Sequence, residues 1–428
     1  MGVAHGCCVT AAVLESAEIH PARLVAFDKA EGTMKISITE RLQHLPLRAF
    51  AAVPFRRVPR LRSRSVLVLV PLALLAILRP SLAEADLFQA YVRDASGGIV
   101  TFALPGSIFS GVSALNDVDQ LAGSYTTPGP GAGQSHGYLR AASGALTTFD
   151  VPGSIDTSVS SLNNSGEVAG AYRTTFDGQS HGYLRDALGA FTTFDVPGST
   201  RTEVFALNNL GQVAGTFDDA SGEHGFLRDA SGGITSFDVP GASETAGIAL
   251  NDVGQVAGDY FIPPLLLERG FLRDASGAFT TLNVPGSTGT VVTALNDLGQ
   301  VAGVFGTGSG GNHGYLWAAS GAFTTFDVPG GTNTVVEALN NLGEVGGSFV
   351  DANGEHGFLR AASGAFTTFD VPGSTRTDVS ALNDAGKAAG VDVVPVPEPS
   401  SIALLGIGVV ALLGFSGFRA RSPMGCRH

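Results

Sequence analysis

Histidine recurs at one position of a repeated sequence and is the first residue type that could carry chemistry. It occupies this position in five copies, whereas Gln89 and Arg269 fill it in the other two. The five are His136, His181, His224, His313 and His356. If the repeated units close into a ring, the imidazoles lie on a circle, which suggests a metal site. Equivalent positions in separate units, however, stand too far apart to bind one ion at metal–nitrogen distances of about 2.0–2.1 Å. We therefore expect each histidine to hydrogen-bond a neighbouring turn.

Carboxylates are the second candidate, because a pair of them performs glycoside hydrolysis. Most of them recur with the repeat, and a residue repeated five times is better explained as shaping a turn: Asp150, Asp195, Asp238, Asp327 and Asp370. The chain contains no G-x-S-x-G or H-E-x-x-H motif, and its three cysteines lie near the termini. We predict no catalytic residue, and a carboxylate pair stays open as an alternative.

Acidic turns and threonine pairs are the remaining candidates. The segments 218–223 and 351–355 cluster oxygen atoms of the kind that bind Ca²⁺. Neither matches the twelve-residue calcium loop, and Asp, Asn and Gly are ordinary turn formers. We therefore expect no cofactor and no metal ligand, with calcium as the alternative. Pairs such as Thr192-Thr193 suggest ice binding, but strands splayed around an axis do not make a flat threonine array, so this is a remote alternative.

These candidates belong to a unit that occurs seven times between Asp86 and Val391. Pro-Gly recurs at spacings of 43–47 residues, and Leu-Asn follows at the same spacings. The unit reads approximately H-G-[FY]-L-R-D-A-S-G-A-F-T-T-F-D-V-P-G-S, a variable stretch, and then A-L-N-[DN]-x-G-Q-V-A-G. The turn after A-L-N ends on Gly in six copies and on Asp119 in the other, which indicates a positive φ at this position.

Turn residues divide each unit into four short β-like runs, and a repeated four-stranded unit of about 40–50 residues is typical of a β-propeller. We predict an all-β, seven-bladed β-propeller of ~44-residue repeats over residues 86–394, with a β-solenoid as the alternative. The repeat region begins partway through a unit, at Ala90–Arg93, and ends partway through another, at Ala388–Val391. We expect Ala90–Arg93 to supply the missing strand of the last blade and so to close the ring without a disulfide.

The repeat also resembles bacterial extracellular repeats of the HAF family. Those repeats pair an A-[IL]-N-[DN]-x-G-Q-V-x-G half with an H-A-F half. Here the second half is His-Gly-Phe or His-Gly-Tyr, as in His136-Gly137-Tyr138 and His224-Gly225-Phe226. The resemblance implies export and a propeller architecture, and it implies no reaction or ligand.

The N-terminal region carries the elements of an export signal. A cluster of arginines precedes Val66–Leu78, which has no charge, and Ala83-Glu84-Ala85 follows with small residues at both cleavage positions. The apolar run is shorter than the roughly 17–25 residues of a membrane span. We assign a signal peptide to residues 56–85, cleaved after Ala85, with Ala83 as the other small residue of the site. Residues 1–55 are left unassigned, as an expected extension of the gene model.

The C-terminal region, residues 395–428, combines three elements in a fixed order. They are Pro397-Glu398-Pro399, an apolar run over residues 402–418, and the arginines Arg419 and Arg421. This arrangement resembles the PEP-CTERM sorting signal of Gram-negative bacteria, which a membrane protease called exosortase recognises. The resemblance implies transient membrane insertion through a transmembrane helix at 402–418, with a permanent anchor as the alternative. The same tag is sometimes labelled an ice-binding protein C-terminal domain, a label that carries no statement about ice affinity.

Composition limits the class of partner. Residues 86–397 contain 11 Lys and Arg against 31 Asp and Glu, so nucleic acid is not an expected partner. The hydrophobic fraction of 44% is ample for a large core and excludes global disorder. The leading hypothesis is a non-enzymatic binding or scaffold protein, exported to the cell surface or extracellular matrix of a Gram-negative bacterium, with exopolysaccharide or matrix components as partners. The alternative is a polysaccharide-active enzyme with a carboxylate pair at the propeller mouth.

Overall fold

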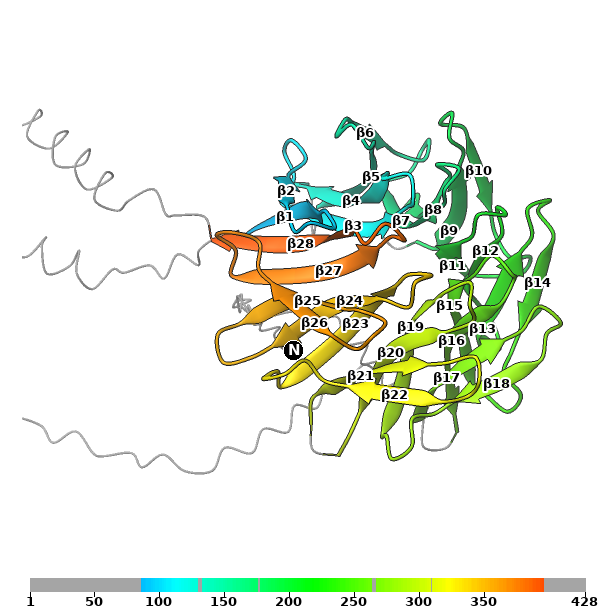
Figure 1. Ribbon diagram of the computed structural model, residues 1–428. Coiled ribbons are helices and arrows are strands. Elements are labelled where there is room, and N and C mark those ends of the chain that lie inside the picture. The colour runs from blue at the N-terminus through cyan, green and yellow to red at the C-terminus, as the bar shows by residue number, and fades with distance from the viewer. Residues whose placement is uncertain (1–85, 130–132, 176–177, 264–266, 309, 396–428) are drawn as a thin grey trace, which may run out of the picture. The chain divides into compact units, whose positions relative to one another are not determined.

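The computed structural model describes residues 86–395, except 130–132, 176–177, 264–266 and 309. The regular structure of these residues consists of 28 β-strands without a helix (Figure 1). None of the described segments is therefore an apolar helix of membrane-spanning length. The predicted signal peptide, residues 1–55 and the predicted helix at 402–418 lie outside the described residues.

Five sheets are four-stranded and antiparallel, and each is built from one repeat unit. The A-L-N run forms the first strand, the V-A-G run the second, the H-G-F run the third and the short F-T-T run the fourth. The sheets comprise β3 (Phe109–Leu115), β4 (Leu121–Thr127), β5 (Gln134–Arg140) and β6 (Leu146–Phe149); β7 (Asp156–Leu162), β8 (Val168–Arg173), β9 (Ser180–Arg185) and β10 (Phe191–Phe194); β11 (Arg201–Leu207), β12 (Val213–Asp219), β13 (Gly222–Arg228) and β14 (Ile234–Phe237); β15 (Glu244–Leu250), β16 (Val256–Ile262), β17 (Leu267–Arg273) and β18 (Phe279–Leu282); and β19 (Gly289–Leu295), β20 (Val301–Gly306), β21 (Asn312–Trp317) and β22 (Phe323–Phe326).

The sixth sheet has eight strands in two antiparallel sets. One set is a complete unit: β23 (Asn333–Leu339), β24 (Val345–Val350), β25 (Glu355–Arg360) and β26 (Phe366–Phe369). The other set, here called the closing unit, combines β27 (Arg376–Leu382) and β28 (Ala388–Pro395) with β1 (Asp86–Arg93) and β2 (Ile99–Phe102) from the other end of the described chain. A single residue pair, Glu355 with Arg376, joins the two sets.

Strand β1 pairs with β28 over eight residue pairs, from Asp86 opposite Pro395 to Arg93 opposite Ala388. The expected closure by Ala90–Arg93 is therefore confirmed. The strand count needs a correction, because the F-T-T run follows the H-G-F run within a unit. The N-terminal segment consequently supplies two strands of the closing unit, β1 and β2, rather than one.

The prediction of an all-β fold made of repeated four-stranded sheets is confirmed. The hydrogen bonding gives six sheets instead of seven separate ones, because the pair between Glu355 and Arg376 merges the last two sets into one sheet. Pairing within each four-stranded set is antiparallel, as in the blades of a β-propeller.

The turn after each first strand has its last residue in the left-handed region. Asp119 has a φ of 64°, and it is the one non-glycine residue with a positive φ in the described part of the chain. The six equivalent glycines have φ values of 71–80°: Gly166, Gly211, Gly254, Gly299, Gly343 and Gly386. The positive φ expected from the sequence is confirmed.

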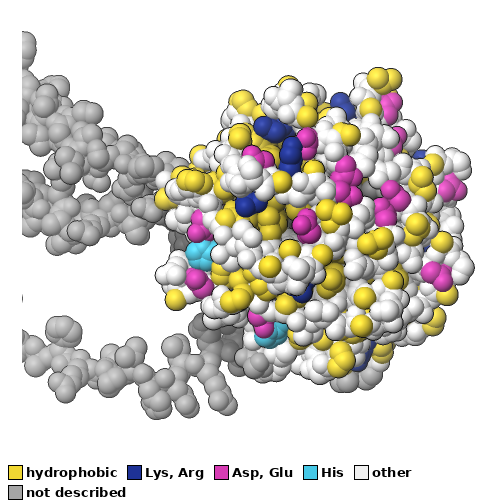
Figure 2. All heavy atoms as spheres, viewed as in Figure 1, with side chains coloured by type: hydrophobic (Ala, Val, Ile, Leu, Met, Phe, Trp, Pro, Cys, Tyr) yellow, Lys and Arg dark blue, Asp and Glu magenta, His cyan; other side chains and the backbone are white. Residues whose placement is uncertain are grey.

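The apolar core lies between neighbouring units. Tyr138 and Leu121 of the β3–β6 unit, for example, pack in one buried cluster with Ala90, Leu104 and Ala389 of the closing unit. The core is thus continuous across the closure, and both faces of a unit are covered. On the surface, acidic side chains outnumber basic ones over the face shown in Figure 2, as the composition leads one to expect.

A stacking contact repeats at these interfaces. The arginine that ends the third strand lies over the phenylalanine that ends the fourth strand of the preceding unit, with the guanidinium carbon 4.7–5.1 Å from the ring centroid. The pairs are Arg93–Phe369, Arg140–Phe102, Arg185–Phe149, Arg228–Phe194, Arg273–Phe237 and Arg360–Phe326. At the remaining interface both residues of the pair are replaced: Trp317 stands in place of the arginine and Leu282 in place of the phenylalanine. Trp317 is buried and packs in one cluster with Leu282.

Candidate functional site

Each of the five repeated histidines is hydrogen-bonded through Nδ1 to the aspartate 14 residues later, at 2.7–2.9 Å. Its ring also packs on an aromatic side chain of the second strand, with centroids 5.1–5.3 Å apart. The pairs are His136–Asp150, His181–Asp195, His224–Asp238, His313–Asp327 and His356–Asp370. The histidines and aspartates singled out in the sequence are therefore partners that tie the third strand to the segment following the fourth.

The sequence carries a signal for this pairing that motif reasoning alone misses. In the two units without the histidine, the aspartate is absent as well: Gln89 is followed 14 residues later by Ala103, and Arg269 by Asn283. Both residues are thus present together or replaced together in all seven copies. Joint replacement within one chain indicates direct contact.

In three of the pairs a hydroxyl lies at the other ring nitrogen, Nε2: Thr127 beside His136, Ser221 beside His224 and Thr307 beside His313. Of these, the Ser221–His224–Asp238 set has the residue types of a hydrolase triad. The Nε2 atom of His224 lies 3.0 Å from Ser221 Oγ, but it also lies 3.2 Å from Asp219 Oδ1. Partial burial lowers the pKa of His224, and the hydrogen bonds and charges of Asp238 and Asp219 outweigh this effect and raise the pKa overall. The Ser221 hydroxyl donates to Asp219 Oδ1 at 2.5 Å, so its proton is directed at a carboxylate and the imidazole is not placed to activate the serine.

The acidic turns use their oxygen atoms within the turns. Asp219 Oδ1 accepts hydrogen bonds from the Ser221 main-chain N–H and hydroxyl at 2.6 and 2.5 Å, and the hydroxyl is the main reason that the pKa of Asp219 is lowered. Asp351 Oδ1 accepts from the Asn353 N–H at 2.6 Å. No group of three potential metal ligands occurs among the described residues. The expectation that the protein carries no cofactor stays a prediction.

The asparagines of the A-L-N motif form a closed circuit of hydrogen bonds. Each Nδ2 donates to the main-chain carbonyl of the equivalent asparagine in the next unit, at 2.9–3.2 Å. The circuit runs through Asn116, Asn163, Asn208, Asn251, Asn296, Asn340 and Asn383 and returns to Asn116. These side chains are 3–4% exposed. The Oδ1 atom of Asn208 also accepts the Gln212 N–H of its own turn, so one side chain shapes a turn and binds the next unit.

The residue after each asparagine forms a second closed circuit. Its main-chain N–H donates to the Oδ1 atom of the equivalent residue in the next unit, at 2.7–2.9 Å. The members are Asp117, Asn164, Asn209, Asp252, Asp297, Asn341 and Asp384. The position requires only an Oδ1 acceptor, which aspartate and asparagine both provide. This explains why either residue occurs there.

The two circuits surround a cavity of about 270 Å³, here called the axial cavity. Its lining comes from the ends of the first strands of all the units, with asparagine, aspartate and leucine side chains. The carboxylates among these residues accept hydrogen bonds from neighbouring amides; Asn209 Nδ2, for example, donates to Asp252 Oδ2 at 2.7 Å. The lining is therefore polar and fixed in place.

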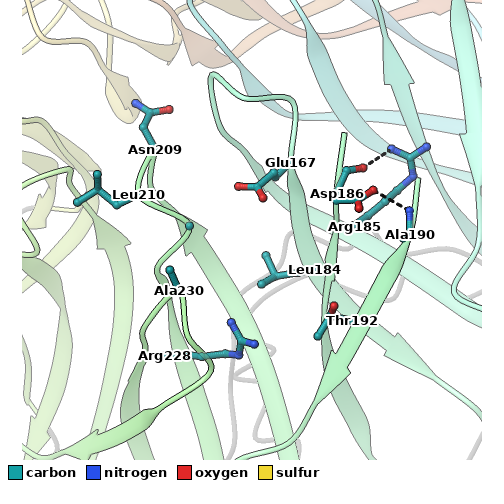
Figure 3. Close-up of a pocket in the computed structure, with 11 residues that line it drawn as sticks. Glu167, Leu184, Arg185, Asp186, Ala190, Thr192, Asn209, Leu210, Arg228 and Ala230 are labelled. Atoms are coloured by element: carbon teal, nitrogen blue, oxygen red, sulfur yellow. Dashed lines mark hydrogen bonds between the residues drawn. The ribbon is translucent and has the colours of Figure 1, made fainter. Parts of the chain in front are cut away.

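A second cavity of about 340 Å³, here called the inter-unit cleft, lies between the β7–β10 and β11–β14 units (Figure 3). Its polar side chains are Glu167, Arg185, Asp186, Thr192, Asn209 and Arg228. Asn209 also lines the axial cavity, so the two cavities adjoin. The volume of the cleft is within the range of about 300–1,000 Å³ that is common for small-ligand sites.

Stacking and hydrogen bonds hold the charged groups of the cleft. Arg185 and Arg228 are 9% and 8% exposed, and each guanidinium is stacked on a phenylalanine of the preceding unit. Within the part of the chain that the structure describes, neither arginine forms an ion pair. Glu167 Oε2 accepts from Asn163 Nδ2 at 2.7 Å. The cleft thus presents cationic donors and carboxylate acceptors in fixed positions.

One carboxyl pair departs from the repeat. Glu337 on β23 and Asp378 on β27 have no acidic counterparts in most units, and their carboxyl groups are hydrogen-bonded to each other. Burial raises the pKa of Asp378 to about 6, and burial followed by the charge of Asp378 raises the pKa of Glu337 well above its usual range. Neither residue lines the axial cavity or the cleft.

The sequence matches the PEP-CTERM protein-sorting motif over residues 395–421. This match indicates an exported bacterial protein sorted to the cell surface and processed by an exosortase, a membrane protein. The motif residues Pro397, Glu398, Pro399, Arg419 and Arg421, and the cleavage residues Ala83 and Ala85, lie outside the described residues. The resemblances to HAF repeats and to the ice-binding C-terminal domain stay predictions.

No curated protein is significantly similar in sequence to this chain. Among solved structures, a streptogramin B lyase has 15% identity and a TM-score of 0.46, over 71% of this chain and 98% of its own. The BP39L lectin from Burkholderia pseudomallei has 9% identity and a TM-score of 0.45, over 66% and 95%. The β-propeller domain of the trilobed protease from Pyrococcus furiosus has 9% identity and a TM-score of 0.47, over 64% and 88%. These similarities are too distant to transfer a function.

Proposed function

We propose that this chain is a non-enzymatic, exported binding or scaffold protein of a Gram-negative bacterium, which binds polysaccharide at the cell surface or in the extracellular matrix. The observation that carries the proposal is the junction of the axial cavity and the inter-unit cleft at Asn209. Together they offer neighbouring donors and acceptors, including Arg228 and Glu167, in fixed positions. Sugar hydroxyls donate and accept hydrogen bonds at once, so such a mixed, prearranged lining suits them.

As part of this proposal, the scaffold is a ring of seven blades. Strands β23–β26 and the closing unit meet at one residue pair, and each has four strands in the order of the other units. Counting them as two blades agrees with the seven members of each hydrogen-bond circuit. A ring closed by two circuits and a continuous core is a rigid frame on which a binding surface keeps its geometry.

The alternative is a polysaccharide-active enzyme, and the Glu337–Asp378 pair is the observation that favours it. Raised pKa values are typical of catalytic acids. Two features speak against this role. Glycosidase carboxyl groups stand about 5–5.5 or 6.5–9.5 Å apart, whereas a direct hydrogen bond requires a closer approach. The pair also lies outside both cavities, so a sugar chain in either of them would not meet it.

Binding and hydrolysis are tested together on the purified full chain, with fragments of bacterial exopolysaccharides as ligands. We expect saturable binding without release of reducing ends. Glu167→Gln should weaken binding about 10-fold or more, because one charge-assisted hydrogen bond is lost. The glutamine should preserve the fold, since Gln120, Gln212, Gln255 and Gln300 occupy the same position in other units.

Glu344→Gln is the matched control. Glu344 accepts a hydrogen bond from Asn340 as Glu167 does from Asn163, but it lies outside the cleft. If Glu167→Gln and Glu344→Gln bind the polysaccharide fragments with equal affinity, the inter-unit cleft is not the binding site. Hydrolysis that Glu337→Gln abolishes would establish the enzymatic alternative.

Processing is tested by mass spectrometry of protein released by cells. Because the PEP-CTERM signal is expected to insert only transiently, the released form should lack the signal segment and everything after about residue 399. Intact residues 402–418 in extracellular material would contradict this, and retention of the whole chain in the membrane would favour the permanent anchor.

A further inference from the structure

The closing unit contains a buried carboxylate where the other units have an aromatic ring. In the second strand, two residues after the glycine of V-A-G, six units carry an aromatic side chain: Tyr125, Tyr172, Phe217, Tyr260, Phe305 and Phe349. The closing unit has Asp392, which is 0% exposed. Within the described residues, neither of its carboxylate oxygens has a hydrogen-bond partner. An ionised carboxylate in this state is costly, because nothing replaces the water it has lost.

Strand β1 is the element that keeps Asp392 covered on one side. Asp392 lies opposite Gln89 of β1 and opposite Thr377 of β27 in the sheet. Among the described strands, β1 and β28 form the one strand pair that joins the two ends of the described chain.

The strands of the closing unit and of the β23–β26 unit carry both acidic and basic groups. From β27 come Asp378 and Arg376, from β23 comes Glu337, from β25 come Glu355 and His356, and from β1 come Tyr91 and Arg93. Strands β2, β3, β24 and β26 carry no titratable side chain. Arg376 is bound to Glu355 at 3.0 Å, and His356 is held by Asp351 and Asp370. Arg376 and His356 are therefore engaged by other carboxylates, and Arg93 is stacked on the Phe369 ring.

Tyr91 connects these acids to β1. Its hydroxyl donates a hydrogen bond to the main-chain carbonyl of Asp378 at 2.9 Å. Burial, and then the charges of Asp378, Asp392 and Glu337, raise the pKa of Tyr91 well above its usual range. The side chain by which β1 reaches β27 thus lies within the field of all three carboxyl groups.

We propose that the pairing of β1 with β28 is a proton-linked latch, which is tight while Asp392 is protonated and loosens as Asp392 ionises. Opening exposes Asp392 to water and separates Tyr91 from the Glu337–Asp378 pair. The remaining units keep their hydrogen-bond ladders. The latch would make the closure of the ring sensitive to the pH of the cell exterior, a property independent of what the protein binds.

The direction of the effect follows from burial. Burial raises the pKa of Asp392 to about 6 in the closed ring, from 3.8 for an exposed aspartate. The closed state therefore binds the proton more tightly than the open state, and closure is favoured most at acidic pH. This advantage is lost between about pH 4 and pH 6, which corresponds to a change of up to about 100-fold in the ratio of open to closed rings.

The test is amide hydrogen exchange of the purified full chain, comparing wild type with Asp392→Asn at the same pH. At pH 7.5 we expect the amides of β1 to exchange more than 10-fold more slowly in Asp392→Asn, and at pH 4.5 to exchange alike. Amides of β16, in another unit, should not change. Asp384→Asn is the matched control, because it removes a charge from the same unit at a position where three other units have asparagine.

Two results would overturn the proposal. One is equal protection of β1 in wild type and Asp392→Asn at pH 7.5. The other is a loss of protection with pH that affects β1 and β16 alike, since this would be global unfolding. If Asp392→Asn does not fold, Asp392→Phe introduces the residue that three other units carry at this position, and the same comparison applies. Wild-type β1 protection, corrected for the intrinsic exchange rate, must in any case fall between pH 4.5 and 7.5.

Discussion

In the β23–β26 unit, His356 is bonded to Asp370 and packs on Phe349, whereas the closing unit has Gln89, Ala103 and Asp392 at the same three positions. The first arrangement ties together strands that are continuous in the chain. The second occurs where the strands come from opposite ends of the described chain. The same backbone pairing is thus supported by a polar and aromatic cluster in one unit and holds an unpartnered carboxylate in the other.

The comparison teaches that closure does not depend on the cluster that stabilises the ordinary units. What the two regions share is the pair of hydrogen-bond circuits, which continue from Asn383 to Asn116 and from Asp384 to Asp117 at 3.1 and 2.9 Å. They also share the apolar core, with Ala90 and Leu104 buried against the next unit. The hydrogen-bond circuits and the apolar core therefore hold every unit to its neighbours, and the histidine–aspartate pair adds to them in five units.

The largest expected effect is that of removing β1. Deletion of Asp86–Asp94 should open the ring, because β28 then has an unpaired edge and two unit faces lose their cover. We expect a lower melting temperature and association of the chain, measured by calorimetry and light scattering. Removal of nine residues after Pro395 should change neither. A monomeric deletion variant with the wild-type melting temperature would show that closure contributes nothing.

The hydrogen-bond circuits should contribute equally to the free energy of unfolding at the closure and in the ordinary units. Asn383→Ala, at the closure, and Asn251→Ala, far from it in sequence, each leave buried main-chain groups without partners. We expect each to lower the free energy of unfolding by about 2–4 kcal/mol in denaturant titrations. A much larger loss for Asn383→Ala would mean that the closure is the weak point of the ring.

The histidine pairs should contribute less, and in a pH-dependent way. Burial lowers the pKa of His356, but the hydrogen bonds and charges of Asp370 and Asp351 raise it overall. Its stabilising contribution is therefore complete below pH 6.5 and is lost as the pH rises through the raised pKa of the folded state. His356→Gln should cost about 0.5 kcal/mol at pH 5.5, since the site is partly exposed, and less at pH 8.5. Thermal unfolding at both pH values measures this, and equal losses would contradict the charged pair.

The smallest expected effect is that of removing divalent cations. Asp219 and Asp351 already accept hydrogen bonds from their own turns and face a histidine. EDTA should therefore leave the melting temperature unchanged. A bound ion at 100 times its Kd would add roughly 2.7 kcal/mol, so a clear shift would establish the calcium alternative.

Much of this site could be predicted from the chain, and the limits are physical. Spacing alone gave the histidine position, but its partner requires two turns to bring Asp150 beside His136. Only the joint replacements, Gln89 with Ala103 and Arg269 with Asn283, carried that information. The inter-unit cleft was not predictable, because Arg228 and Glu167 are 61 residues apart and meet through the packing of neighbouring units. Similarly, Glu337 and Asp378 appear in the sequence as ordinary surface acids.

The sequence by itself determined the local structure of this protein. Alternating turn and β-branched residues set four strands per unit, the glycine or Asp119 set the turn, and the sorting motif indicated export, because each depends on a short stretch of chain. Only the tertiary structure decided how the ends meet. The pairing of Asp86 with Pro395 and the closing bonds of the two circuits join groups hundreds of residues apart, and Asp392 is buried beside that closure. Burial, not residue type, makes that aspartate a candidate proton switch.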